Sequence, residues 1–282
     1  MEAYGMYLAL SPGALGMHTG SLAEAIALAK ETGYGGVEFS IQEAASLIES
    51  DGADSVRALF AAAGIRPAGF GLPVAWNGSE EDWKEGLDRL VVYARAAEAL
   101  GCHRTFTWIL SGSNDRTEAE NRAFHIERFR PIAEILNAHG CRLGLEFLGP
   151  KTIRKDLKYP FVHDTPGMMG LAREIGSNVG LLLDSWHWHT SAGRPGDILR
   201  LTARDVVYVH VNDAPPDVLL DDHIDSKRAL PGATGVIDMN GFLNALESIG
   251  YDGPIVAEPF GNPASWAADL MRAALKRARS AA

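Results

Sequence analysis

The sequence predicts a (β/α)8 TIM barrel, an α/β fold in which one domain spans residues 1–282. Eight short apolar segments alternate with longer amphipathic segments along the chain, which is the order of repeated strand–helix units. The length of 282 residues also fits, because such a barrel typically needs about 250 residues. A doubly wound open sheet is the structural alternative. It would usually need no eighth unit and no polar residue at so many strand ends.

The expected strands are short, rich in apolar residues and hardly alternate, as parallel strands buried on both faces do. Cys102 and Cys141 each stand at the start of one of them, so we expect two buried, reduced thiols near the bottom of the barrel. The eight segments are Met6–Leu10, Gly35–Ser40, Ile65–Leu72, Cys102–Leu110, Cys141–Leu148, Val179–Asp184, Asp205–Val211 and Gly253–Phe260.

Helical patterns lie between these segments. The first begins at Ser21 as an N-cap, carries an apolar stripe and ends at Gly33. Two further helices are expected to start at Thr165-Pro166 and Arg194-Pro195, because proline is tolerated in a first helical turn. The other expected helices are Ser79–Leu100, Thr117–His139, Met239–Ile249 and Ala264–Ala278. Two long, charged loops, Leu148–Asp164 and Asn212–Asp238, are expected to act as lids.

The charge and the hydropathy of the chain indicate which kinds of partner it binds. The net charge of −10 and the pI of about 5.4 weaken any nucleic-acid-binding interpretation, since phosphate neutralisation supplies most non-specific binding. No apolar run reaches the roughly 18–20 residues that a membrane span needs. The N-terminal segment lacks the basic region of a signal peptide. We therefore expect a cytoplasmic protein that acts on a small molecule, without nucleic-acid or membrane partners.

Polar residues end four consecutive strands of the expected barrel. They are Glu146, Asp184, His210 and Glu258, and the carboxyl ends of barrel strands are where active sites lie. Three carboxylates this close repel one another and are costly to desolvate unless protons or a cation compensate. The set predicts one divalent metal ion: Mn²⁺ first, with Mg²⁺, Co²⁺ and Zn²⁺ as alternatives for an oxygen-rich site with one histidine.

Other residues near the strand ends are candidates for substrate binding. His187 follows Asp184 by three residues and is expected to contact substrate, to support the metal ligands or to bind a second metal. Glu38, at the end of the second strand, could hydrogen-bond substrate or hold the loops together. Four aromatic residues could line the pocket or pack under the loops instead, namely Trp76, Trp108, Trp186 and Phe260.

Several motifs resemble the sugar phosphate isomerase/epimerase family of the xylose isomerase-like TIM barrel superfamily. They are LSPGALG, VGLLLDSWHWHTSAG, VVYVHVNDAP, RALPGATGVID and ALESIGYDGPIVAEPF, in this order along the chain. The resemblance implies a Glu/Asp/His/Glu metal site on the four strand-end residues and a substrate contact for His187. It also implies that Arg228, shortly before the PG of its loop, binds a substrate hydroxyl or anionic group. Many members of the family are homodimers or homotetramers, but no segment here indicates an interface.

The resemblance implies a mechanism in which the metal stabilises an enediolate while carboxylates remove and return the α-proton. Glu146 and Glu258 are the expected acid and base, and the expected activity is that of an isomerase or epimerase of a sugar, sugar phosphate or keto-polyol. A lyase is the first alternative, such as an inosose or dehydroshikimate dehydratase or a C-glycoside-cleaving enzyme, because these reactions begin with the same proton abstraction. More remote alternatives are an apurinic-endonuclease-like phosphodiesterase and a non-catalytic sugar binder.

Overall fold

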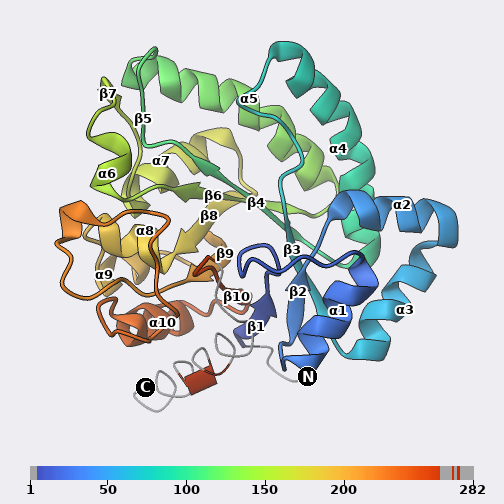
Figure 1. Cartoon of the computed structure of the whole chain (residues 1–282). Helices are drawn as coiled ribbons and strands as arrows, with labels where there is room; N and C mark the ends of the chain where they lie inside the picture. The colour runs from blue at the N-terminus through green and yellow to red at the C-terminus, as the bar shows by residue number, and fades with distance from the viewer. Residues whose placement is uncertain (1–4, 261–268, 270–271, 274–282) are drawn as a thin grey trace.

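Eight parallel strands close into a barrel, as the sequence predicts (Figure 1). The computed structural model describes residues 5–260, 269 and 272–273. Around the barrel the strands follow the order β1-β10-β9-β8-β6-β4-β3-β2, and all eight pairings are parallel. Their bounds are β1 Tyr7–Leu10, β2 Gly36–Glu38, β3 Arg66–Gly71, β4 Arg104–Ile109, β6 Arg142–Phe147, β8 Val179–Asp184, β9 Val206–Val211 and β10 Pro254–Ala257.

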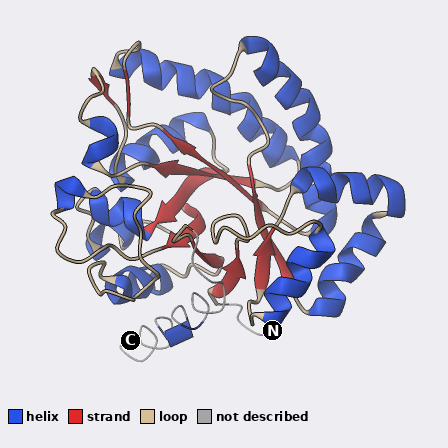
Figure 2. Cartoon of the chain, viewed as in Figure 1, coloured by secondary structure: helices blue, strands red, loops and turns tan. Residues whose placement is uncertain are grey.

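Helices surround the strands (Figure 2). Their bounds are α1 Leu22–Glu31, α2 Ile41–Asp51, α3 Ala53–Ala63, α4 Glu80–Leu100, α5 Glu118–Ala138, α6 Lys151–Arg154, α7 Thr165–Ile175, α8 Ser185–Thr190, α9 Pro195–Ile198 and α10 Met239–Ser248, with a 3-10 turn, η1, at Leu220–Asp222. The expected helix over Ala264–Ala278 falls mostly outside the described residues. None of the described helices is long and apolar enough to cross a bilayer.

Local sequence explains where the longer helices begin and end. The Ser21 hydroxyl accepts the backbone N–H of Glu24 at 3.2 Å and caps α1. Thr117 and Glu120 form a reciprocal capping box at the start of α5, which satisfies two backbone donors that the first turn leaves free. At the other end of α4, Gly101 has φ +69°, a left-handed conformation that glycine adopts without steric cost.

The structure adds elements that the sequence pattern did not predict. The connection between β2 and β3 contains two helices, α2 and α3, where no helix bounds were predicted. Beyond the barrel rim, β5 (Gly112–Ser113) pairs antiparallel with β7 (Tyr159–Pro160). This small ribbon joins the loops after β4 and β6, so it braces two of the loops that rise above the mouth of the barrel.

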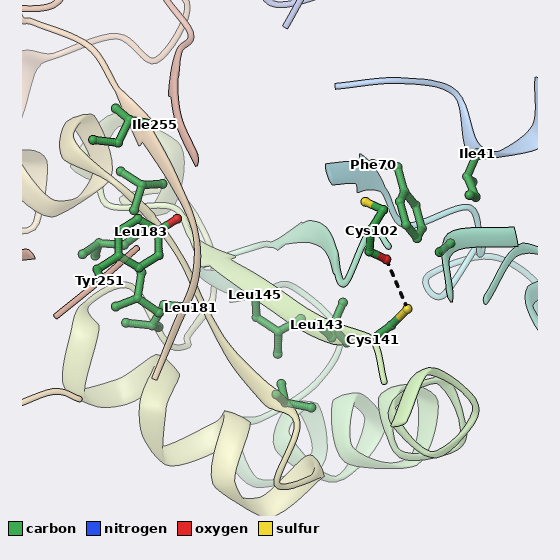
Figure 3. Packing of buried hydrophobic residues seen from close by; sticks show 14 of the residues in the cluster. Ile41, Phe70, Cys102, Cys141, Leu143, Leu145, Leu181, Leu183, Tyr251 and Ile255 are labelled. Atoms are coloured by element: carbon green, nitrogen blue, oxygen red, sulfur yellow. Dashed lines mark hydrogen bonds between the residues drawn. The ribbon is translucent and has the colours of Figure 1, made fainter. Parts of the chain in front are cut away.

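Side chains of the strands pack in two directions. One set packs between the barrel and the helices and includes Leu143, Leu145, Leu181, Leu183 and Ile255 (Figure 3). The other set forms a small separate cluster inside the barrel: Ala9, Ala68, Leu182, Tyr208 and Val256, with Tyr7 and Phe106 against it. Successive residues of a strand point to opposite faces, so this interior layer identifies which strand positions face the mouth.

Both cysteines are buried and free, as the sequence predicts. They precede the neighbouring strands β4 and β6, and the Cys141 thiol lies 3.6 Å from the backbone carbonyl oxygen of Cys102 (Figure 3). Burial raises the pKa of each thiol to about 12. A thiol with so high a pKa stays protonated and is a poor nucleophile, so neither cysteine is a candidate for catalysis.

Candidate metal centre

The period of the strands places four polar side chains inside the barrel mouth. Leu182, Tyr208 and Val256 face the barrel interior. Asp184, His210 and Glu258 each follow one of these residues by two positions in the sequence. A spacing of two keeps side chains on one face. Glu146, near the end of β6, joins them from the adjacent strand. The four side chains come from strands that are consecutive neighbours in the barrel, and they therefore meet at one point.

The four side chains lie close enough to share an ion. Each offers one ligand atom, and these atoms lie within 4.8 Å of one another. His210 Nδ1 is 3.3 Å from Glu258 Oε2 and 3.8 Å from Glu146 Oε1. Both His210 Nδ1 and Glu146 Oε1 are buried without a hydrogen-bond partner. Buried polar atoms normally have partners, so these two atoms fit a divalent cation between them.

Protonation states show how the cluster tolerates its own charge without a metal. Burial, reinforced by repulsion from Glu258, raises the pKa of Glu146 well above its ordinary value. Burial acts against the charged form of His210, but Glu258 and Glu38 outweigh it and raise the pKa of His210. Burial likewise opposes ionisation of Glu258, yet His210 and Arg228 lower the pKa of that carboxyl to about 2. Protons thus offset negative charge in the cluster that a cation would otherwise offset.

Asp184 is fixed by the elements on either side of it. Its Oδ1 accepts the backbone N–H of Trp186 at 2.9 Å, which caps α8, and the side-chain amide of Asn212 at 3.0 Å. Its other oxygen, Oδ2, accepts Arg228 Nη1 at 2.8 Å. The first two contacts hold the carboxylate in place, and Oδ2 is left facing the cluster.

Arg228 reaches the cluster from the loop after β9. Its side chain is only 2 % exposed. Nη1 donates to Asp184 Oδ2 and, at 2.7 Å, to Glu258 Oε2, and Nη2 donates to Asp225 Oδ1 at 2.8 Å. Burial disfavours the charged guanidinium, but these carboxylates outweigh it and raise the pKa of Arg228. The arginine is therefore a permanent cation that ties its loop to two of the candidate metal ligands.

His187 also faces the cluster, from α8. Its Nδ1 accepts the backbone N–H of Gly149 at 3.2 Å. Burial lowers the pKa of His187 to about 3, so the ring is neutral, and the proton sits on Nε2 because Nδ1 is an acceptor. Nε2 is 3.9 Å from Asp184 Oδ2 and 3.3 Å from Arg228 Nη2. Two donors therefore stand side by side at the edge of the cluster.

Glu38 lies on the opposite side of His210. Its Oε1 is 3.6 Å from His210 Nε2 and has no hydrogen-bond partner. The Tyr208 and Phe106 rings pack against the imidazole edge to face, with centroids 5.7 and 5.6 Å away. Glu38 also lines a cavity of about 430 Å³ at the mouth, beside β1, β2 and β3. The Glu38 carboxylate thus borders both the cavity and His210.

The predicted aromatic residues divide into two groups. Trp186 is fully buried and lies under Arg228, whose guanidinium carbon is 5.5 Å from the ring centroid, and Phe260 lies 4.6 Å from the same atom. Trp108 is 45 % exposed at the end of β4 and meets the buried Trp76 edge to face at 6.3 Å. Trp186 and Phe260 therefore support the arginine, whereas Trp108 and Trp76 belong to a separate wall.

Three contributors to the site were not predicted from the sequence. Asp225 holds Arg228, Asn212 holds Asp184, and Phe106 packs on His210. Asn212 carried a usable signal, because it is a polar residue directly after a buried strand. Asp225 had only its spacing of three residues from Arg228, which many surface pairs share.

Comparisons with known proteins agree with this fold. The chain matches the family model described as xylose isomerase-like TIM barrel over residues 26–279. Its structure aligns with a xylose isomerase domain protein from Alicyclobacillus acidocaldarius at a TM-score of 0.86 and 30% identity, covering 98% of this chain and 100% of that one. It also aligns with the IOLI protein, solved with a bound zinc atom, at a TM-score of 0.74 and 19% identity, over 97% and 96% of the two chains.

Among curated relatives, an inosose isomerase of Halalkalibacterium halodurans is 22% identical over 251 residues, which cover 86% of this chain and 84% of that protein. A 3-dehydroshikimate dehydratase of Pseudomonas aeruginosa is 30% identical over 138 residues, 47% of this chain and 20% of the relative. These two relatives are enzymes of two reaction classes, an isomerase and a dehydratase. With the family model covering most of its length, the chain belongs to the xylose isomerase-like TIM barrel family.

Proposed function

We propose that this protein is a metal-dependent isomerase or epimerase of a small keto-sugar or keto-polyol. One observation carries the proposal: three carboxylates and one histidine lie within 4.8 Å of one another at the carboxyl ends of neighbouring barrel strands. Glu146, Asp184, His210 and Glu258 would hold one divalent ion, with Mn²⁺ expected first and Mg²⁺, Co²⁺ or Zn²⁺ as alternatives. A bound ion of this kind supplies Lewis-acid stabilisation of negative charge on substrate oxygens.

Glu146 and Glu258 are the proposed acid and base. They come from different strands and converge on His210, so they can approach one carbon from two sides. One carboxylate removes the proton from the carbon next to the carbonyl, and the other returns a proton to the opposite face or to the adjacent carbon. In the metal-free site, burial raises the pKa of Glu146, whereas His210 and Arg228 outweigh burial and lower the pKa of Glu258 to about 2, so the two carboxylates lie in different environments.

His187 and Arg228 are proposed to orient the substrate. The neutral ring of His187 offers Nε2–H, and Arg228 Nη2 lies 3.3 Å away. Neither group can accept a hydrogen bond from the other, so a substrate oxygen that accepts from both would satisfy them. Trp186 and Phe260 keep the guanidinium in this position, and Trp108 is proposed to contact substrate from the far rim.

A lyase is the second candidate function. The similarity to a 3-dehydroshikimate dehydratase over 138 residues favours it, and a dehydratase would use the same proton abstraction before losing water. A small-molecule substrate and no nucleic acid are proposed for either activity. A cytoplasmic location and a homodimer or homotetramer remain predictions.

Incubation with a ketose in deuterated water separates the two activities. The metal-loaded protein should incorporate deuterium next to the carbonyl and form an isomer or epimer, both visible by NMR. Appearance of a conjugated ultraviolet chromophore would instead identify a dehydratase. If the metal-loaded protein exchanges no proton with any ketose or inosose, the enzymatic proposal is wrong.

Glu146→Gln and Glu258→Gln test the two carboxylates. Each variant should fold normally and lower the exchange rate by about 10²–10⁴-fold, the usual contribution of a positioned acid or base. Glu120→Gln is the matched control, because Glu120 caps α5 at the surface. Wild-type exchange in either active-site variant would exclude that residue as the acid or base.

A further inference from the structure

The amino-terminal end of the barrel, opposite the metal cluster, carries a group of arginines. Arg104 and Arg142 are the first residues of β4 and β6, and they stand side by side as register partners. Successive side chains of a strand alternate between its two faces, so Arg104 lies on the same face as Phe106, and Arg142 on the same face as Glu146. Phe106 packs against the cluster inside the barrel. Both arginines therefore begin the inner face of the barrel wall.

The two side chains reach across this end of the barrel. β4 and β10 lie on opposite sides in the strand order, yet Arg104 Nη2 is 3.4 Å from Oδ1 of Asp252, which stands two residues before β10. Arg142 Nη2 donates to the backbone carbonyl oxygens of Arg204 and, at 3.5 Å, of Val206. Val206 is the first residue of β9, and β9 is two strands away from β6. The guanidinium groups thus lie across the amino-terminal opening of the barrel.

Positive charge exceeds negative charge at this end, although the chain as a whole has a net charge of −10. The charges of Arg104 and Arg204 act on Arg142, where they add to burial and lower the pKa of the guanidinium. Within the described residues, the one carboxylate in an ion pair with these three arginines is that of Asp252. Three positive charges minus one negative charge leave an excess of two. Arg66, the first residue of β3, adds a further cation at the same end.

The protein uses few of the donors that these arginines offer. A guanidinium carries five N–H donors. Within the described part of the chain, Arg104 donates to Asp252 alone, and its Nε is buried without a hydrogen-bond partner. Arg142 donates there through Nη2 only. Because a buried donor without an acceptor is costly, a bound anion with several acceptor oxygens would stabilise this arrangement.

We propose that the amino-terminal end of the barrel binds a phosphate group, either as inorganic phosphate or as a small phosphate monoester. A phosphate dianion matches the excess of two positive charges, and guanidinium groups bind phosphate oxygens in pairs. Solvent reaches the site, since the side chains of Arg104 and Asp252 are 24% and 67% exposed. Arg142 and Glu146 are four residues apart on β6, a span of about 13 Å. The phosphate site is therefore separate from the metal centre and does not depend on the proposed activity.

Titration of the metal-free, full-length protein tests the site, because phosphate then has no bound ion to coordinate. Inorganic phosphate and glycerol 3-phosphate are the probes, followed by calorimetry and phosphorus NMR at constant ionic strength in chloride. We expect a Kd of about 1 mM or lower for at least one probe. Tighter binding of glycerol 3-phosphate would identify a phosphate monoester as the ligand, and tighter binding of inorganic phosphate the free anion. Binding of neither probe up to about 10 mM would overturn the inference.

Two exposed residues give variants with opposite expected effects. Arg204 is exposed, so Arg204→Gln should fold normally and weaken phosphate binding about fivefold by removing one positive charge. Asp252→Asn removes the competing carboxylate and should strengthen binding about fivefold, which no loss of structure would do. Arg89→Gln is the matched control, because Arg89 is exposed on α4, where it pairs with Glu85, and the variant changes the net charge by the same amount. Equal affinities of the Arg204 and Arg89 variants, or weaker binding by Asp252→Asn, would overturn the inference.

Discussion

At the scale of single residues, two candidate metal ligands carry protons that a metal must displace. Burial raises the pKa of Glu146, and Glu258 together with Glu38 raises that of His210 against the effect of burial. Both groups therefore hold their protons to a higher pH than the free side chains do, whereas Glu258, with a pKa of about 2, is already ionised near neutral pH. Metal ligands must be deprotonated, so binding has to release protons.

We predict that metal binding at pH 7 releases protons from Glu146 and His210 and that affinity rises with pH. Below their raised pKa values, Glu146 and His210 hold protons in the metal-free protein. Lowering the pH therefore strengthens the competition of protons with the metal ion for these two groups. Calorimetric titration of Mn²⁺ in buffers of different ionisation enthalpy measures the release. An observed enthalpy that is the same in every buffer would show that the two groups do not titrate with the metal.

Glu38 is predicted to position His210 in addition to lining the cavity. A carboxylate next to the second ring nitrogen of a metal-ligating histidine fixes the ring, and loss of such a partner typically lowers metal affinity by about 10–100-fold. Glu38→Gln should reduce Mn²⁺ affinity by that amount. Glu43→Gln is the matched control, since Glu43 lines the same cavity and contacts Leu22 instead. Equal affinities of the two variants would assign Glu38 to the cavity alone.

The four cluster residues could be predicted because their positions follow from short-range rules. Each lies at or next to the end of an apolar strand, and parallel strands end at one rim. Asp225 and Phe106 could not be predicted in the same way. Their roles depend on the path of the loop after β9 and on which side of β4 faces inward, and both are consequences of the closed barrel.

At the scale of elements, the loop Asn212–Asp238 depends on one buried carboxylate. Asp213 is fully buried, and its two oxygens accept the backbone N–H groups of Ala214, Thr234, Gly235 and Ile237. Its backbone also pairs with Ala229, next to Arg228. The contacts of Asp213 thus hold together the two ends of the loop that carries Arg228.

Asp213→Ala is predicted to loosen this loop and destabilise the protein by about 3 kcal/mol or more, because each buried donor left without a partner costs about 1–3 kcal/mol. Hydrogen exchange should rise at residues 229–237, and denaturant unfolding should measure the loss. Asp222→Ala is the control, as Asp222 is exposed in the same loop. Unchanged exchange at residues 229–237 in Asp213→Ala would mean that other contacts hold the loop.

The strands and long helices were predictable to within a few residues, but the connections were not. α4 and α5 begin at Ser79 and Thr117, where capping residues mark the start. No helix was predicted between the second and third strands, although Ser40 caps α2 and Gly52 separates α2 from α3. The β5–β7 pair joins segments far apart in sequence, so no local pattern contains it.

At the scale of the whole molecule, the proposed metal centre would link four strands of the closed barrel. Candidate ligands from β6, β8 and β9, with Glu258 directly after β10, would make one ion a cross-link between neighbouring strands. A ligand that binds only the folded state stabilises it by about 2.7 kcal/mol at a concentration of about 100 times Kd. For a chain of this size, Mn²⁺ should therefore raise the melting temperature by roughly 5–10 °C.

Glu146→Gln tests whether this stabilisation acts through the proposed site. Without metal, burial favours the protonated form of Glu146 by raising its pKa, and glutamine has nearly the shape of a protonated glutamate. The variant should therefore melt close to the wild-type temperature when metal-free, yet lose most of the increase that Mn²⁺ causes in the wild type. Calorimetric scans of both proteins with and without Mn²⁺ measure the difference. If the variant gains as much as the wild type, the ion stabilises the barrel from another place and the four-residue cluster is not the metal centre.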